Sequence, residues 1–125
     1  MKLLAVITWP EWRLRPANQR ERRHWAVVKR MNAPPLPRRV GIMADGAEVK
    51  GPHKQRLVEV TRWGPRMLDE DGLYSSVKPC LDAIRCRKLN GHVVPGFLFD
   101  DSPRYCRLRV FQKKGGYGCE VRVYG

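Results

Sequence analysis

The clearest hydrophobic pattern in the chain lies in residues 67–84, where apolar positions recur with the period of a helix. At about 100° per residue, one side of this helix gathers five apolar side chains: Leu73, Val77, Cys80, Leu81 and Ile84. The opposite side carries Asp71, Ser75, Lys78 and Asp82. The pattern predicts an amphipathic helix with a buried face. Because Pro79 removes one backbone hydrogen bond, we expect either a kink there or a regular part that begins after Asp71.

Short stretches with period-two alternation predict strands around this helix. They cover residues 3–7, 40–43, 54–63, 105–112 and 118–124. The Gly-rich, charged residues 44–53 predict a long hairpin connection between the second and third strands. Residues 113–117 predict a hairpin turn between the last two strands. We expect residues 85–88 to be a basic helix end and residues 89–95 to be a loop.

An arginine-rich segment predicts a second helix near the start of the chain. Pro16 is a favourable first helical residue, and residues 17–31 are rich in helix formers. The chain has 125 residues, which fits one domain. We therefore predict a single α/β (α+β) domain over residues 1–125, in which a mixed sheet of about five strands packs against two main helices.

The charge of the chain points to a polyanionic partner. Lys and Arg total 25 and Asp and Glu total 12, which gives a net charge of +13. Nucleic acid is the simplest partner, with an anionic membrane surface as the other option; no segment approaches the ~18 apolar residues of a membrane span. Residues 13–31 are either a phosphate-binding face or a solvated surface. The predicted nucleic-acid contacts are Arg20, Arg22, Arg23, Lys29, Arg30, Arg62, Arg66 and Lys78.

The four cysteines do not form a zinc-binding pattern, because no Cys-x-x-Cys pair is present. The apolar run after Lys2 is too short for a secretion signal. We therefore expect free, mostly buried thiols in a cytoplasmic protein.

Two acidic pairs stand out in this basic chain: Asp69 with Asp71, and Asp100 with Asp101. Carboxylate oxygens are the ligands that Mg²⁺ prefers, and a bound Mg²⁺ can activate water and stabilise charge on a phosphate. Lys78 could position a phosphate on the same helix face. The structural alternative is that the first pair caps a helix and the second belongs to a turn. The scattered histidines receive no role.

Several segments together resemble the RusA family of Holliday-junction resolvases, which phages and prophages often encode. The resemblance covers about half of the chain. It rests on the segments 60–66 (Val-Thr-Arg-Trp-Gly-Pro-Arg), 68–73 (Leu-Asp-Glu-Asp-Gly-Leu), Lys78, 81–83 (Leu-Asp-Ala), Gly96 and Asp100-Asp101. Asn18 and residues 24–26 (His-Trp-Ala) are similar to the start of some phage members.

The resemblance implies a homodimeric endonuclease that uses Mg²⁺ or Mn²⁺ to cleave four-way DNA junctions in recombination and repair. No membrane and no small-molecule cofactor would be involved, and the protein would be cytoplasmic and associated with the nucleoid of a bacterium. The implied catalytic residues are Asp69, Asp71, Asp101 and Lys78. The implied metal ligands are Asp69, Asp71 and Asp101, with Asp100 as an alternative.

Two departures from the family pattern define the main rival. Lys78 matches the family lysine only if about three residues are inserted after Asp71, and Gly72 stands where the family has asparagine. The asparagine side chain would order the loop, whereas glycine loosens the backbone. The first rival is therefore an inactive relative that binds branched or duplex DNA without cutting it. The second is a basic RNA-associated protein.

Overall fold

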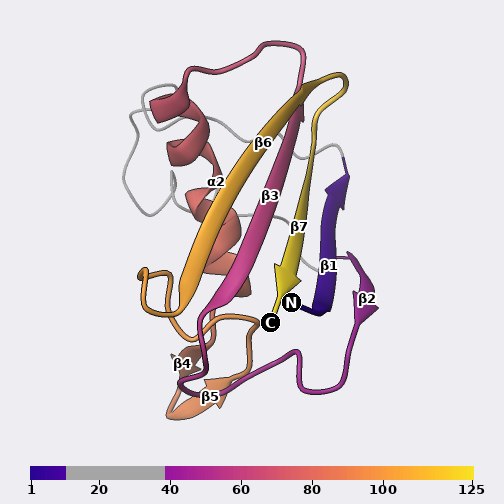
Figure 1. Ribbon diagram of the computed structural model, residues 1–125. Helices are drawn as coiled ribbons and strands as arrows, with labels where there is room; N and C mark the ends of the chain where they lie inside the picture. Colours follow the sequence, from indigo (N-terminus) through magenta and orange to yellow (C-terminus); the bar gives the residue numbers. More distant parts are fainter. Residues whose placement is uncertain (11–38) are drawn as a thin grey trace.

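Burial alternates strictly along β3 (Arg56–Gly64), in which every second residue is buried. The computed structural model describes residues 1–10 and 39–125. In this part of the chain β3 joins β1 (Leu3–Pro10), β2 (Arg39–Met43), β6 (Cys106–Lys114) and β7 (Gly118–Tyr124) in one sheet, ordered β2-β1-β7-β3-β6 (Figure 1). β3 and β6 run parallel, and all other neighbours run antiparallel. The sheet is therefore mixed, as predicted.

The helix α2 (Glu70–Ile84) connects the parallel strands β3 and β6. Parallel strands need such a crossover, because a tight turn can join only antiparallel neighbours. All five apolar residues predicted for its buried face are buried, together with Ser76. The helix begins at Glu70 and continues through Pro79, so it does not start after Asp71. It ends at Ile84 with no basic residue in its last turn, so the predicted basic helix end is wrong.

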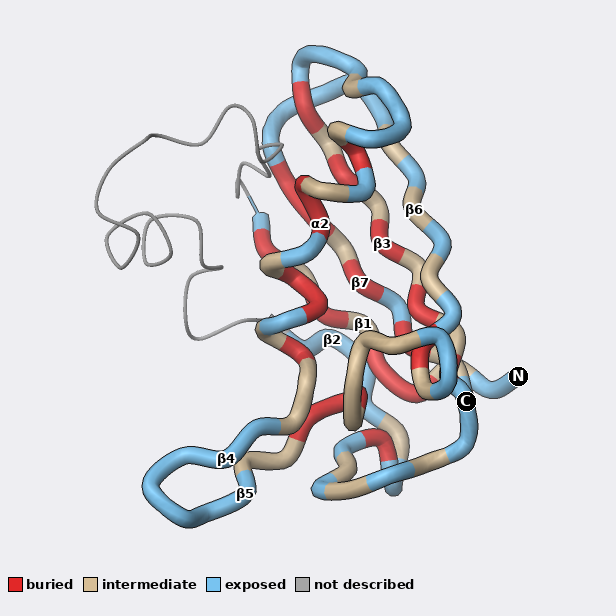
Figure 2. Tube along the Cα trace, turned by 90° about the vertical axis from the view of Figure 1, so that its left-hand side faces the viewer, coloured by how far each residue is buried: buried red, intermediate tan, exposed pale blue. Residues whose placement is uncertain are grey.

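The hydrophobic core lies between α2 and one face of the sheet (Figures 1 and 2). The inward positions of β1, β3 and β7 meet the buried face of the helix there. Phe97 and Leu98, which lie between β5 and β6 in the chain, also belong to this core and are fully buried. As a result, the residues that follow them are held against the helix.

The pairing of two strands differs from the prediction. β2 pairs with β1 and not with β3, and β6 pairs with β3 and not with β7. Both predicted hairpins are therefore wrong. The reason lies in the sheet order, because β7 inserts between β1 and β3. The connection from β6 to β7 passes the end of β3, where the Gly115 N–H donates to Gly64 O at 3.1 Å.

A small hairpin replaces the loop that was predicted for residues 89–95. β4 (Arg87–Leu89) pairs with β5 (His92–Val94) in a separate two-stranded sheet. Its turn residues, Asn90 and Gly91, have φ angles of 50° and 79°. Positive φ at both central residues is what a type I′ hairpin turn requires, and Asn-Gly is its preferred sequence.

The remaining expectations concern the second helix, membranes and cysteines. Residues 17–31, where the second helix was predicted, lie outside the described residues. Among the described residues, α2 is the one α-helix. No helix in residues 1–10 and 39–125 is long and apolar enough to cross a membrane. The four cysteines are free, and three of them are buried. Two of these, Cys80 and Cys119, have sulfur atoms 3.4 Å apart.

Candidate functional site

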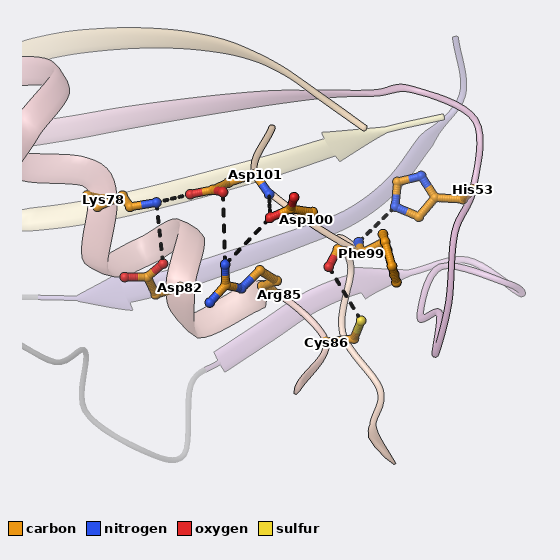
Figure 3. A network of polar contacts seen from close by, with 8 residues as sticks. All are labelled: His53, Lys78, Asp82, Arg85, Cys86, Phe99, Asp100 and Asp101. Carbon is orange, nitrogen blue, oxygen red and sulfur yellow. Dashed lines mark hydrogen bonds and ion pairs between the residues drawn. The ribbon is translucent and has the colours of Figure 1, made fainter. Parts of the chain in front are cut away.

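A network of ion pairs joins the exposed face of α2 to the residues that precede β6 (Figure 3). The Lys78 ammonium contacts the Asp101 carboxylate directly and lies 3.7 Å from Asp82 Oδ1. Seven residues after Lys78, at the C-cap of the helix, Arg85 Nη1 lies 3.6 Å from Asp100 Oδ1 and 3.9 Å from Asp101 Oδ1. Three acids and two cations thus share one surface, and the acids are in excess by one charge.

The helical period places these side chains together on α2. Lys78 and Asp82 are four residues apart, so their side chains lie one above the other on the same face. Arg85 is the C-cap residue, where a cation is close to the last carbonyls of the helix. The side chain of Lys78 is 51% exposed, whereas that of Asp101 is only 20% exposed. Lys78 is therefore the member of the central pair that a ligand in solvent reaches most easily.

Backbone hydrogen bonds fix the segment that carries the two adjacent acids. The Phe97 N–H donates to Ile84 O at 2.7 Å, and the Cys86 N–H donates to Leu98 O at 2.7 Å. Both bonds tie this segment to the end of α2. The Asp100 carboxylate accepts from the backbone N–H of Asp101 at 2.9 Å, which orients the acidic pair itself.

His53 completes this support, a role that no pattern in the sequence indicated. Its Nε2 accepts a hydrogen bond from the Phe99 N–H at 3.0 Å, and its Nδ1 lies 2.6 Å from Lys54 O (Figure 3). Since Nε2 accepts, the ring must carry its proton on Nδ1, which then donates to the carbonyl. Burial is the main cause that lowers the pKa of His53, which favours this neutral form.

Two arginines of β3, one of them a predicted DNA contact, are buried and hydrogen-bonded. Arg56 is buried and donates to Ala47 O at 2.6 Å and Phe97 O at 2.8 Å, so it links a distant loop to the start of the acidic segment. Arg62, a predicted phosphate contact, is 4% exposed and donates to Arg66 O at 2.9 Å. This burial departs from the predicted role. Both arginines occupy inward positions of an alternating strand, and that position is the signal that identifies them.

Asp69 and Asp71 lie at the other end of the helix. Asp69 is the N-cap, and its carboxylate accepts from the Gly72 N–H at 2.7 Å, so the capping interpretation is confirmed for this residue. Asp71 lies in the first turn and is exposed. It precedes Lys78 by seven residues, which corresponds to about 10.5 Å along the axis. Asp71 therefore lies on the same side of α2 as Lys78 and its partner Asp101, but two turns away.

The acids fit a sparse magnesium site better than a compact one. Within the described residues, no group of three or more His, Cys, Asp or Glu side chains converges in a way that could hold a metal ion. Asp100 and Asp101 are adjacent hard oxygen donors on a fixed segment. Mg²⁺ often binds through one or two carboxylates, with water and substrate phosphates completing its shell. The described residues match that type of site.

The remaining predicted DNA contacts divide into two groups. Arg66 is exposed in the connection that leads into α2. Five others lie outside the described residues: Arg20, Arg22, Arg23, Lys29 and Arg30.

Comparison of the chain with protein-family models, with curated proteins and with solved structures gave no match. The resemblance to RusA resolvases therefore remains a hypothesis that rests on the residues quoted above.

Proposed function

We propose that this protein is a Mg²⁺-dependent endonuclease that cleaves four-way or other branched DNA in recombination and repair, acting as a homodimer. The observation that carries the proposal is the contact between Lys78 and Asp101, which come from separate elements and meet on an accessible surface. A net charge of +13 supports a DNA substrate. Mn²⁺ could serve in place of Mg²⁺.

In this proposal each side chain has a defined task. Asp101, with Asp100 beside it, would hold one metal ion, with water and substrate phosphates completing its shell. The predicted ligands Asp69 and Asp71 lie two helical turns away, so they would hold only a separate ion along the same bound strand. The bound metal would supply water activation and stabilisation of charge on the phosphate. Lys78 would donate to a phosphate oxygen of the scissile strand, because its ammonium is exposed and is held in place by Asp82 and Asp101.

The basic surface would recognise the shape of the DNA. Arginine and lysine bind phosphates, and such contacts orient a protein on DNA without reading its sequence. A dimer with two-fold symmetry would present two sites to two strands of a four-way junction, which has the same symmetry. Paired cuts on opposing strands would follow from that arrangement.

A second candidate function is junction binding without cleavage, and one observation favours it. Asp100 and Asp101 are already paired with Arg85 and Lys78, and Asp69 serves as a helix cap. In a protein that only binds DNA, these acids would stabilise the fold and would have no metal to hold.

Cleavage of a labelled synthetic four-way junction in Mg²⁺ distinguishes the two functions. We expect paired nicks near the branch point that disappear in EDTA and in Asp71→Asn and Asp101→Asn. Asp45→Asn is the matched control, since it removes the same charge from an exposed loop residue outside the network. Junction binding without nicks in Mg²⁺ or Mn²⁺ would support the binding function. Equal affinity for RNA, linear duplex and junction at one stated salt concentration would refute both.

A further inference from the structure

The hairpin β4–β5 follows the end of α2 and projects from the body of the protein (Figures 1 and 2). All residues from Arg87 to Val93 are exposed, including the turn at Asn90 and Gly91. A two-stranded hairpin is at best marginally stable by itself. Its persistence here therefore requires either a firm base or a ligand.

The base of the hairpin is held by close contact between backbones. Gly96 follows β5 and Cys86 precedes β4, and a Cβ atom at Gly96 would lie only 2.4 Å from Cys86 N. Gly96 also exchanges two hydrogen bonds with Val49, at 2.6 and 3.0 Å. The hairpin thus rises from a fixed base and is not a loose loop.

The exposed surface of the hairpin combines apolar and cationic side chains. Leu89 is 56% exposed and Val93 is 36% exposed, so neither contributes much to the core. Arg87 and Lys88 are exposed on β4, the strand that also carries Leu89, and residues 87–94 contain no acid. Single exposed apolar residues are common and need no explanation. The strand register pairs Leu89 with His92 and Lys88 with Val93, so Leu89 shares one face of the hairpin with Arg87 and Val93 shares the other face with Lys88. Each face of this projection therefore offers one cation and one apolar side chain to a ligand that has both phosphates and apolar faces.

The hairpin has a fixed position relative to the acids of the candidate site. Arg85, two residues before β4, pairs with Asp100 and Asp101. The chain that leaves β5 enters the segment whose Phe97 and Leu98 are hydrogen-bonded to Ile84 and Cys86, and it reaches Asp100 six residues after Val94. A ligand bound by the hairpin is therefore placed at a defined distance from these carboxylates.

We propose that β4–β5 inserts at the branch point of DNA, with Arg87 and Lys88 on backbone phosphates and with Leu89 and Val93, on opposite faces of the hairpin, against the base pairs exposed on its two sides. This inference rests on the proposed function and deepens it. In linear duplex DNA the faces of the bases are stacked, whereas apolar side chains of DNA-binding proteins insert where stacking is interrupted. Leu89 and Val93 would then supply the preference for branched DNA that phosphate contacts alone cannot provide.

The test compares the double variant Leu89→Ser/Val93→Ser with Val40→Ser/Ile42→Ser. The control pair lies on the edge strand β2, with 39% and 54% exposure, so it removes similar exposed apolar surface elsewhere. Dissociation constants are measured in EDTA at one salt concentration, for a four-way junction and for linear duplex. We expect the hairpin variant to bind the junction about tenfold more weakly and the duplex unchanged. We expect the control variant to match the wild type on both.

The charged residues give a second readout. Arg87→Gln/Lys88→Gln should weaken binding to junction and duplex alike and reduce the slope of log affinity against log salt by about 1.8. A fluorescent base analogue at the branch point should respond to wild-type protein and not to the Leu89/Val93 variant. Circular dichroism of each variant verifies that the body remains folded.

Failure of this inference is distinguishable from failure of the proposed function. If wild-type protein prefers the junction and the Leu89/Val93 variant retains that preference, the hairpin inference alone is overturned. The same holds if the variant loses self-association or binding to anionic vesicles while junction binding is unchanged. If wild-type protein shows neither cleavage nor preference for the junction, the proposed function itself is refuted.

Discussion

Replacing Arg56 by methionine removes a guanidinium that holds together two segments far apart in the sequence. The side chain is 8% exposed and donates to three carbonyl oxygens, those of Gly46, Ala47 and Phe97, at 3.2, 2.6 and 2.8 Å. A buried carbonyl that loses its donor costs about 1–3 kcal/mol. The contacts to Ala47 and Phe97 are buried, and methionine recovers part of the loss through its apolar stem. We therefore expect a loss of about 3 kcal/mol in the free energy of unfolding.

Urea unfolding measures this loss directly. With a slope of about 2 kcal/mol per molar urea for a small domain, the midpoint should fall by about 1.5 M. Arg109→Met is the matched control, because Arg109 is exposed on β6 and the substitution changes charge and volume equally. That control should stay within about 0.5 kcal/mol of wild type. A loss below about 1 kcal/mol for Arg56→Met would refute the view that this arginine ties the two segments together.

Three further predictions test the local geometry. Gly96→Ala should cost about 2–3 kcal/mol in urea unfolding, because its Cβ would overlap backbone atoms of residues 84–86. Gly51→Ala, with open space around its Cβ, should be near neutral, and equal effects would contradict the close packing. Asp69→Ala should cost about 1 kcal/mol of stability without metal, through loss of the cap; an unchanged thermal midpoint in EDTA would contradict that role. Burial raises the pKa of Cys106 to about 11. The folded thiol therefore keeps its proton where the unfolded thiol has lost it, so stability should fall as pH rises from about 8.5 towards 11. Cys106→Ala should show a shallower fall, and identical pH profiles would contradict the shift.

The local periodicity of apolar residues was sufficient to predict α2 and the main strands. The buried face of the helix follows from the 3.6-residue period, because side chains at that spacing share one side whatever they pack against. Pairing was not predictable in the same way. An alternating strand such as β6 shows which face is buried but not which strand lies beside it, so proximity in the chain suggested β7 where the structure has β3.

The candidate site, too, was predicted only in part from the sequence. Lys78, Asp100 and Asp101 were predicted from residue type and resemblance, and the structure brings these three together. His53 was missed because it lies 46 residues from Phe99, and nothing in its own neighbourhood indicates that contact. Asn90-Gly91 did carry a local hairpin signal, which the short length of the flanking strands obscured.

The position of β7 has a consequence for how the protein folds during its synthesis on the ribosome. β7 follows the other described strands of the sheet in the chain, yet it lies between β1 and β3 in that sheet. Until β7 leaves the ribosome, no strand joins the β1–β2 pair to the β3–α2–β6 unit in the described sheet. The inward-facing residues of both parts then remain exposed. Such nascent chains expose apolar surface and strand edges that favour aggregation. The described sheet can therefore be completed only once residues 118–124 have left the exit tunnel.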